Sequence, residues 1–211
     1  MEHTLSILAL SSGVISLLCL LSLHFTSPEY QPSWRMISEY ALGKYKGLLT
    51  SFFFLWGACS ILVSILLWKE VTTTWAMIGV VLLLVSAIGE IMGGLFDLKH
   101  KLHGMAFMLG VPALPVAALL ISYNLIQLDD WSHAKSTIMF FVHATWISLV
   151  LMGVAMVVMI SGFKKAGLVV EQNAPVPEKV PDGVIALAGY ANRLLVVSYV
   201  IWLIVVVWVK Q

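Results

Sequence analysis

Hydrophobic side chains occur in long runs that are separated by short polar stretches. There are six such runs, at residues 5–25, 47–68, 75–96, 104–125, 137–163 and 184–209. A helix needs about 20 apolar residues to cross roughly 30 Å of hydrocarbon, and every run reaches that length. The runs lack the two-residue alternation of barrel strands, so they predict helices. We therefore expect an all-α membrane protein, a compact bundle of six transmembrane helices, with residues 1–211 in a single polytopic transmembrane domain.

The composition agrees with a chain that lies in a bilayer. Of its 211 residues, 60% are hydrophobic and only 11% are charged, whereas a soluble domain has about 25% charged residues. The net charge of +1 provides no basic field, so no nucleic-acid partner is expected. Cys19 and Cys59 lie in apolar runs and form no CxxC motif. The first lysine or arginine is Arg35, so the first run lacks the basic start of a cleavable signal peptide and is interpreted as a retained span.

Lysine and arginine gather on one side of the predicted bundle. The loops after the first, third and fifth runs carry eight of them, namely Arg35, Lys44, Lys46, Lys99, Lys101, Lys164, Lys165 and Lys179. The opposite side carries three, namely Lys69, Lys135 and Lys210. Because cytoplasmic loops are enriched in these residues, we predict a multi-pass protein of the plasma (inner) membrane with basic cytoplasmic loops and both termini outside. The oligomeric state is left open.

The loops of the basic side are longer than those of the other side. Residues 26–46 contain two prolines and several tyrosine and tryptophan residues, which favour the membrane interface. A loop of this length is often functional, so it is interpreted either as a lid over the mouth of the bundle or as an interfacial connector. Residues 164–183 contain three prolines and mixed charges, which is typical of a linker.

A few charged side chains interrupt the apolar runs, where hydrocarbon disfavours them. Glu90 and Asp97 are seven residues apart, so a continuous helix places both on one face, looking into one cavity. Arg193 lies inside the last run and needs a partner, with Glu90 or Asp97 the natural choice by depth. A structural ion pair is one reading; the other is recognition of a carboxylate or phosphate headgroup by the guanidinium. The predicted ligand-binding residues are Arg193, Glu90, Ser38 and Glu39.

A second group of polar residues lies between the third and fourth runs. His100 and His103 have the His-x-x-His spacing, and Asp97 precedes them. Imidazole and carboxylate ligands suit a divalent metal such as zinc, so Asp97, His103 and His100 are the candidate metal ligands. The alternative is that both histidines are exposed in the loop and bind nothing. His24, at the end of the first run, is interpreted as an interfacial residue or a further ligand.

Several short motifs together resemble the domain-of-unknown-function 998 family. They are ISEYALG at residues 37–43, Phe96-Asp97, His103-Gly104, and residues 189–193 followed by an apolar run with Trp202. They occur in the family's order among six spans and cover essentially the whole chain. The family usually has an acid before the last arginine, whereas this chain has Asn192, so a local acid–arginine pair is lost. The resemblance implies an uncharacterised polytopic membrane protein and transfers no reaction.

These observations support three functional hypotheses. The first is a protein that binds or transports a lipid or a small anionic molecule, based on Arg193 and the long loop. The second is a metal-dependent membrane hydrolase that acts on a lipid, in which a metal activates water and a carboxylate accepts its proton. The third is a structural or accessory membrane subunit whose polar residues hold the bundle together.

Overall fold

A computed structural model describes residues 2–168, 177 and 179–210. Within this part of the chain, six helices are long and apolar enough to cross a membrane, which confirms the predicted all-α, six-span bundle. They are α1 (Glu2–Thr26), α2 (Lys46–Leu67), α3 (Thr74–Leu95), α4 (His103–Leu125), α6 (Lys135–Lys165) and α7 (Ala188–Val209). Two short helices complete the set, η1 (Ile37–Leu42) and α5 (Asp129–Ser132).

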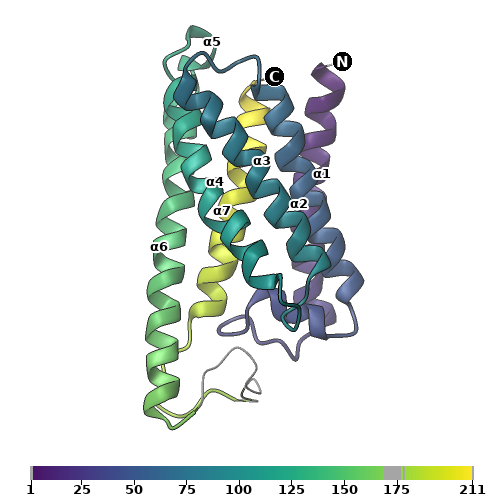
Figure 1. Ribbon diagram of the computed structural model, residues 1–211, viewed down its shortest axis with the longest axis vertical. Helices are drawn as coiled ribbons and strands as arrows, with labels where there is room; N and C mark the ends of the chain where they lie inside the picture. Colours follow the sequence, from purple (N-terminus) through teal and green to yellow (C-terminus); the bar gives the residue numbers. More distant parts are fainter. Residues whose placement is uncertain (1, 169–176, 178, 211) are drawn as a thin grey trace.

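The long helices run side by side, and both termini lie at the same end of the bundle (Figure 1). The opposite end, called the basic end below, holds residues 27–45, 96–102, 166–168 and 179–187. Residues 27–45, called the lid below, include η1 and cross the open end of the helices. This arrangement places the predicted basic loops together, while the assignment of that end to the cytoplasm stays a prediction.

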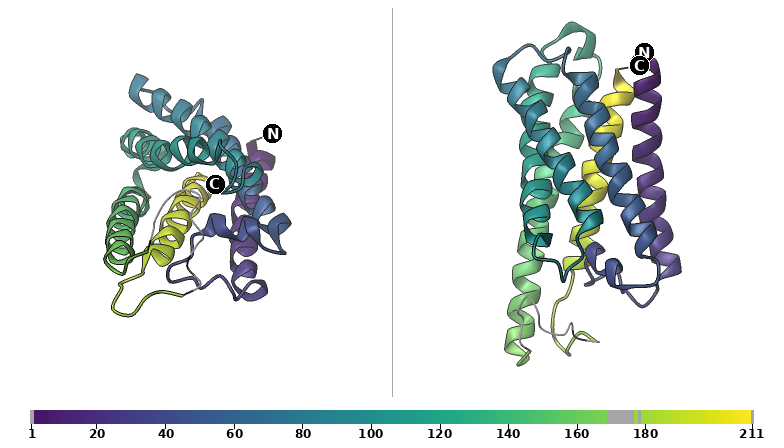
Figure 2. Two further views of the ribbon diagram at one scale, coloured as in Figure 1. Left: turned by 60° about the horizontal axis from the view of Figure 1, so that its bottom comes forward. Right: turned by 45° about the vertical axis from the view of Figure 1, so that its right-hand side comes forward.

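Helix α7 is the most enclosed span, and α6 is the longest. Figure 2 shows α7 with α6 on one side and α1 and α2 on the other. Of the six spans, α7 has the largest buried share, so its polar residues must find partners inside the protein. Helix α6 has 31 residues, compared with 22 in α7, and continues past its neighbours at the basic end (Figure 1).

The predicted start of the last span differs from the structure. Residues 184–187 precede α7, which begins at Ala188. Val184 packs against Gly162 near the end of α6, and a small second core forms there around Trp34 and Phe163. Val184 and Ala186 pack against that core, and hydropathy alone does not distinguish such packing from a membrane span.

Helices α3 and α4 pack closely because glycines face each other. A Cβ atom added to Gly89 of α3 would collide with the Gly110 backbone of α4. Small residues allow two helix backbones to approach in this way. The Gly110 carbonyl also accepts a hydrogen bond from the Ser86 hydroxyl of α3 at 2.8 Å, so the close contact is polar as well as steric.

Helix α4 contains Pro115, which has no N–H for the carbonyl of Val111 one turn earlier. The Tyr199 hydroxyl of α7 donates to that carbonyl at 2.8 Å. A carbonyl freed by proline inside a membrane needs such a partner from a neighbouring helix. The bond fixes α7 against α4 close to the basic half of the bundle.

Candidate functional site

The lid is held to the bundle by one arginine. Nε of Arg193 donates to Nε2 of His24 on α1 at 2.6 Å. Nη1 donates to the lid carbonyls of Pro32 at 3.3 Å and Arg35 at 2.7 Å, and Nη2 donates to the Tyr40 hydroxyl at 3.1 Å. The side chain is buried, with 8% of its residue surface exposed. We call this set the arginine latch, because it joins α7, α1 and the lid.

The predicted pairing of Arg193 with Glu90 or Asp97 is wrong. All acceptors of the arginine latch are uncharged, and the described residues contain no ion pair to Arg193. Asp97 instead accepts from Nζ of Lys46 at 3.0 Å. The prediction was based only on the depth of these residues in the membrane. In the structure, the lid brings backbone carbonyls to the guanidinium, and the spacing of side chains in the sequence does not indicate backbone partners.

The lid backbone lies directly on α7 at Gly189. The amides of Gly189 and Tyr190 donate to the Ser33 carbonyl at 2.9 and 3.2 Å. A Cβ atom at position 189 would collide with the carbonyl of Pro32 and would lie 2.7 Å from the amide nitrogen of Trp34. A glycine at this position is therefore what allows the lid to reach the latch.

Glu39 stabilises the lid from within. Its Oε1 accepts from the Met36 amide at 2.7 Å, which closes the start of η1, and its Oε2 accepts from Nη1 of Arg35 at 2.7 Å. The Arg35 guanidinium lies 4.3 Å from the centre of the Trp34 ring. Both Glu39 oxygens thus have partners inside the lid, so the structure places this residue apart from the other predicted ligand-binding residues.

A cavity lies beneath the lid, among α2, α3, α4 and α7. Its volume is about 100 Å³. Most of its wall is apolar, and the polar side chains in the wall are those of Ser38, Trp56, Glu90, His103 and Asn192. The wall therefore brings together residues from the lid and four helices that are far apart in the sequence.

Glu90 is buried in this wall with 2% of its surface exposed, and its partners are hydroxyl groups. Ser60 donates to Oε2 at 2.7 Å, and the Ser86 hydroxyl lies 2.8 Å from Oε1. The same Ser86 hydroxyl lies 2.8 Å from the Gly110 carbonyl. No ion pair to Glu90 occurs among the residues that the structure describes.

Asn192 connects the cavity to the lid. Its Oδ1 accepts from the Ile37 amide at 2.9 Å, and its Nδ2 lies 3.6 Å from Sδ of Met152 on α6. Asn192 thus fastens the lid segment that covers the cavity and also forms part of the wall. A carboxylate here would keep the acceptor for Ile37 but would lose the donor to Met152.

The chain matches the family described as Protein of unknown function (DUF998) over residues 10–209. The chain belongs to the DUF998 family. No curated protein and no solved structure matches it. The resemblance predicted from the short motifs is therefore confirmed, together with the six-span membrane fold.

In this DUF998 protein, two of the short motifs meet at the lid. Residues 37–43 form η1 and the turn after it, and residues 189–193 lie beneath them on α7. The bond from Ile37 to Asn192 and the arginine latch join the two segments. The predicted lid thus covers the bundle mouth, as one of the two readings of this loop expected.

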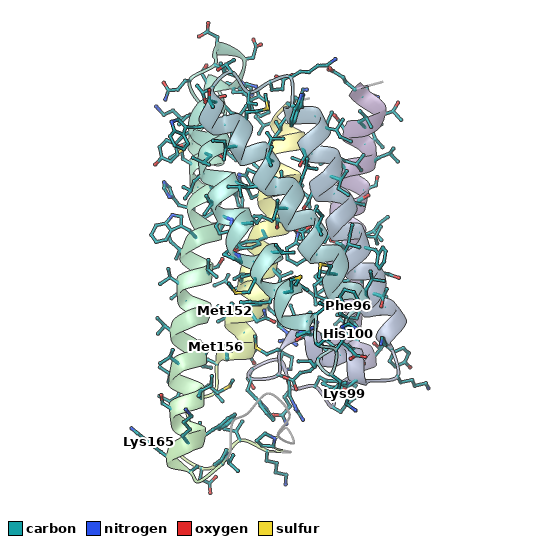
Figure 3. All side chains as sticks on the ribbon, in the orientation of Figure 1. Phe96, Lys99, His100, Met152, Met156 and Lys165 are labelled. Atoms are coloured by element: carbon teal, nitrogen blue, oxygen red, sulfur yellow. The ribbon has the colours of Figure 1, made fainter. Side chains whose placement is uncertain are left out.

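The predicted metal ligands of the DUF998 chain have other contacts. His100 lies beside Phe96 (Figure 3) and stacks on it with ring centres 4.4 Å apart. Nδ1 of His103 lies 2.9 Å from the Phe96 carbonyl. The ammonium of Lys46 lowers the pKa of Asp97 by a direct hydrogen bond. Within the described ranges, no group of three His, Cys, Asp or Glu residues is placed to hold a metal ion.

Asp97 also lies outside the cavity. Helix α3 ends at Leu95, and the next residue is extended, so the seven-residue spacing from Glu90 no longer follows one helical face. Of the three predicted metal ligands, His103 forms part of the cavity wall. The structure therefore brings His103, Glu90 and Ser38 together, and it separates Asp97, His100, Glu39 and Arg193 from them.

Trp56 is a wall residue that the sequence did not reveal. It is 3% exposed, and its indole N–H has no acceptor among the described residues. A tryptophan usually places its N–H on a partner when buried, or lies at the membrane interface. The one available signal was its position near the middle of α2, away from both helix ends.

Proposed function

We propose that this protein binds an amphiphilic lipid or a similar small molecule of the bilayer, and that the polar part of the ligand occupies the cavity beneath the lid. The single observation that carries the proposal is the cavity itself, a mostly apolar space with a few convergent polar side chains. Binding sites for small molecules commonly have this character. The bilayer supplies such molecules at high local concentration.

The size of the cavity limits what it holds. A volume of about 100 Å³ is smaller than the roughly 150 Å³ cavity that accommodates benzene. The site therefore takes a headgroup or a short segment of a few heavy atoms, and the remainder of a longer ligand lies outside. Phe107 forms part of the wall and is 44% exposed, so the wall reaches the outer surface of α4 at this residue.

The arginine latch supports the proposal by positioning the lid. Ligand contact by Arg193 would require breaking its hydrogen bonds to Pro32, Arg35 or Tyr40. Such bonds to a charged donor contribute more than neutral ones, so displacing them opposes binding. The residue therefore serves the site indirectly, by holding Ile37 and Ser38 over the cavity.

Filling the cavity tests the proposal. Ala106 of α4 is buried in the wall, and Ala113, two helical turns later, is outside it. We expect protein purified in mild detergent to carry bilayer lipid that native mass spectrometry detects. Ala106→Leu should lose that lipid, and Ala113→Leu, the same change on the same helix, should keep it. Equal lipid complements in all three proteins would contradict the proposed function.

A further inference from the structure

We infer that the ligand presents an uncharged hydrogen-bond acceptor to the cavity, such as the carbonyl oxygen of an ester or ketone lipid. The inference rests on the function proposed above and names the ligand class of the same site. Three features of the wall support it. The described wall residues include no lysine or arginine, the partners of Glu90 are hydroxyl groups, and the donors of Trp56 and Asn192 lack a strong acceptor.

The wall is unsuited to an anion. Its described residues include Glu90 but no lysine and no arginine. The nearby guanidinium of Arg193 already donates hydrogen bonds to the lid carbonyls and to His24. The remaining basic group is His103, whose Nδ1 is already 2.9 Å from the Phe96 carbonyl. An anionic headgroup would thus lie beside a buried carboxyl group without a fixed counter-charge.

The surroundings of Glu90 favour its neutral form. The Ser86 hydroxyl has one hydrogen and lies within bonding distance of two acceptors, Oε1 of Glu90 and the Gly110 carbonyl. If that hydrogen goes to Gly110, a proton on Oε1 completes a chain from Glu90 to Ser86 to Gly110. An ionised Glu90 would place a charge where only 2% of the residue surface is exposed and where no described residue forms an ion pair with it, and such a place penalises charge. A neutral acid gives a cationic headgroup no counter-charge.

Two residues of the wall carry a hydrogen-bond donor without a strong acceptor. The Trp56 N–H has no acceptor in the described part of the chain. The Asn192 Nδ2 group is paired with a thioether sulfur at 3.6 Å, which is a weak acceptor. Because a buried donor is stabilised by gaining an acceptor, a ligand carbonyl supplies what these residues lack. An aliphatic segment alone would leave them unchanged.

Three probes with the same alkyl chain separate the classes, a methyl ester, a carboxylate and a primary ammonium. We measure their dissociation constants on the detergent-solubilised full chain by calorimetry, and repeat the measurement on Trp56→Phe, which keeps a ring but removes the N–H. The ester should bind at least about tenfold more tightly than either charged probe. Trp56→Phe should weaken the ester by about threefold to tenfold, as expected for one neutral hydrogen bond. Ala113→Leu should bind it as the wild type does.

The outcomes distinguish the ligand class from the proposed function. Tighter binding of the carboxylate or of the ammonium probe would overturn the class. If no probe binds while Ala106→Leu still loses the co-purified lipid, the class is overturned and the proposed function stands. If no probe binds and that variant keeps its lipid, both fail. The ranking of probes on the unmodified protein needs no variant, so it decides the class even if Trp56→Phe is unstable.

Discussion

Arg193 and Glu90 are both ionisable and both buried in membrane-spanning helices, yet their surroundings differ. The guanidinium of Arg193 donates from all three of its nitrogens to acceptors on α1, α7 and the lid. Glu90 has two serine partners and lies in the wall of a cavity. All three nitrogens of the Arg193 guanidinium thus have acceptors within the protein, whereas the cavity wall contains one buried donor without an acceptor among the described residues, the Trp56 N–H.

This difference shows that the cost of burying a charge does not by itself identify a binding residue. A residue whose bonds are all made within the protein stabilises a particular arrangement of the chain. A residue beside a cavity with unmatched donors is available to a ligand. We therefore expect substitutions in the arginine latch to reduce mainly the stability of the protein, and substitutions in the cavity wall to reduce mainly the binding of a ligand.

The largest effect is expected for Arg193→Met, which removes every donor of the latch. The carbonyls of Pro32 and Arg35 and the Tyr40 hydroxyl would lose their partner, at a total cost of about 3 kcal/mol or more. Thermal unfolding in detergent should show a large decrease in Tm. If the variant kept a normal Tm but lost its bound lipid, Arg193 would be a ligand-binding residue and not mainly a stabilising one.

Gly189→Ala should have the next largest effect. The new Cβ atom would press on the lid backbone at Pro32 and Trp34, and such overpacking costs roughly 1–3 kcal/mol. Hydrogen exchange of the lid amides should rise together with the fall in Tm. Gly153→Ala is the matched control, since no heavy atom lies within 4 Å of its Cβ position and alanine favours a helix. Equal losses in both variants would contradict the close contact of the lid.

Glu90→Gln should change stability by less than about 1 kcal/mol, because the amide is a neutral isostere of the acid. Its oxygen accepts from Ser60, and its NH₂ group donates to the Ser86 hydroxyl. Thermal unfolding beside Glu90→Leu, which removes both bonds, measures this difference. A Gln variant as unstable as Glu90→Leu would contradict the neutral, hydrogen-bonded form of Glu90.

The smallest effect concerns the exposed pair of Asp97 and Lys46. Lys46 lowers the pKa of Asp97 in the folded protein, so the pair stabilises the fold at neutral pH. That contribution should disappear as the pH falls from the unfolded value of about 3.9 through the lowered pKa. The side chain of Lys46 is 47% exposed and that of Asp97 is 29% exposed, so the contribution of the pair is below about 1 kcal/mol. The Tm difference between wild type and Asp97→Asn, measured against pH, should shrink in acid. A constant difference would exclude the pair as its cause.

The six-span fold was predictable from the sequence because each helix that crosses a bilayer must consist mainly of apolar residues. Every backbone group in hydrocarbon must be paired, so long apolar runs become helices whatever their neighbours are. The prediction was least accurate at residues 184–187, which precede α7 and of which Val184 and Ala186 pack against the second core near Phe163. Apolar residues occur both where a segment packs on a core and where it crosses a membrane, and the sequence alone does not distinguish these two cases.

The candidate site was predictable only in part. Glu90, His103 and Ser38 were expected at one mouth, and the cavity wall contains all three. The partners of Arg193 were not predictable, because lid carbonyls belong to the backbone and leave no trace in side-chain spacing. Trp56 was missed because an indole in an apolar run resembles any other hydrophobic residue until its N–H is seen without an acceptor.

The length of α6 exceeds what a membrane crossing requires. Its 31 residues rise about 46 Å at roughly 1.5 Å per residue, compared with a hydrocarbon thickness of about 30 Å. The excess of some 15 Å corresponds to about ten residues, and Lys164 and Lys165 lie at the end of the helix that continues past its neighbours.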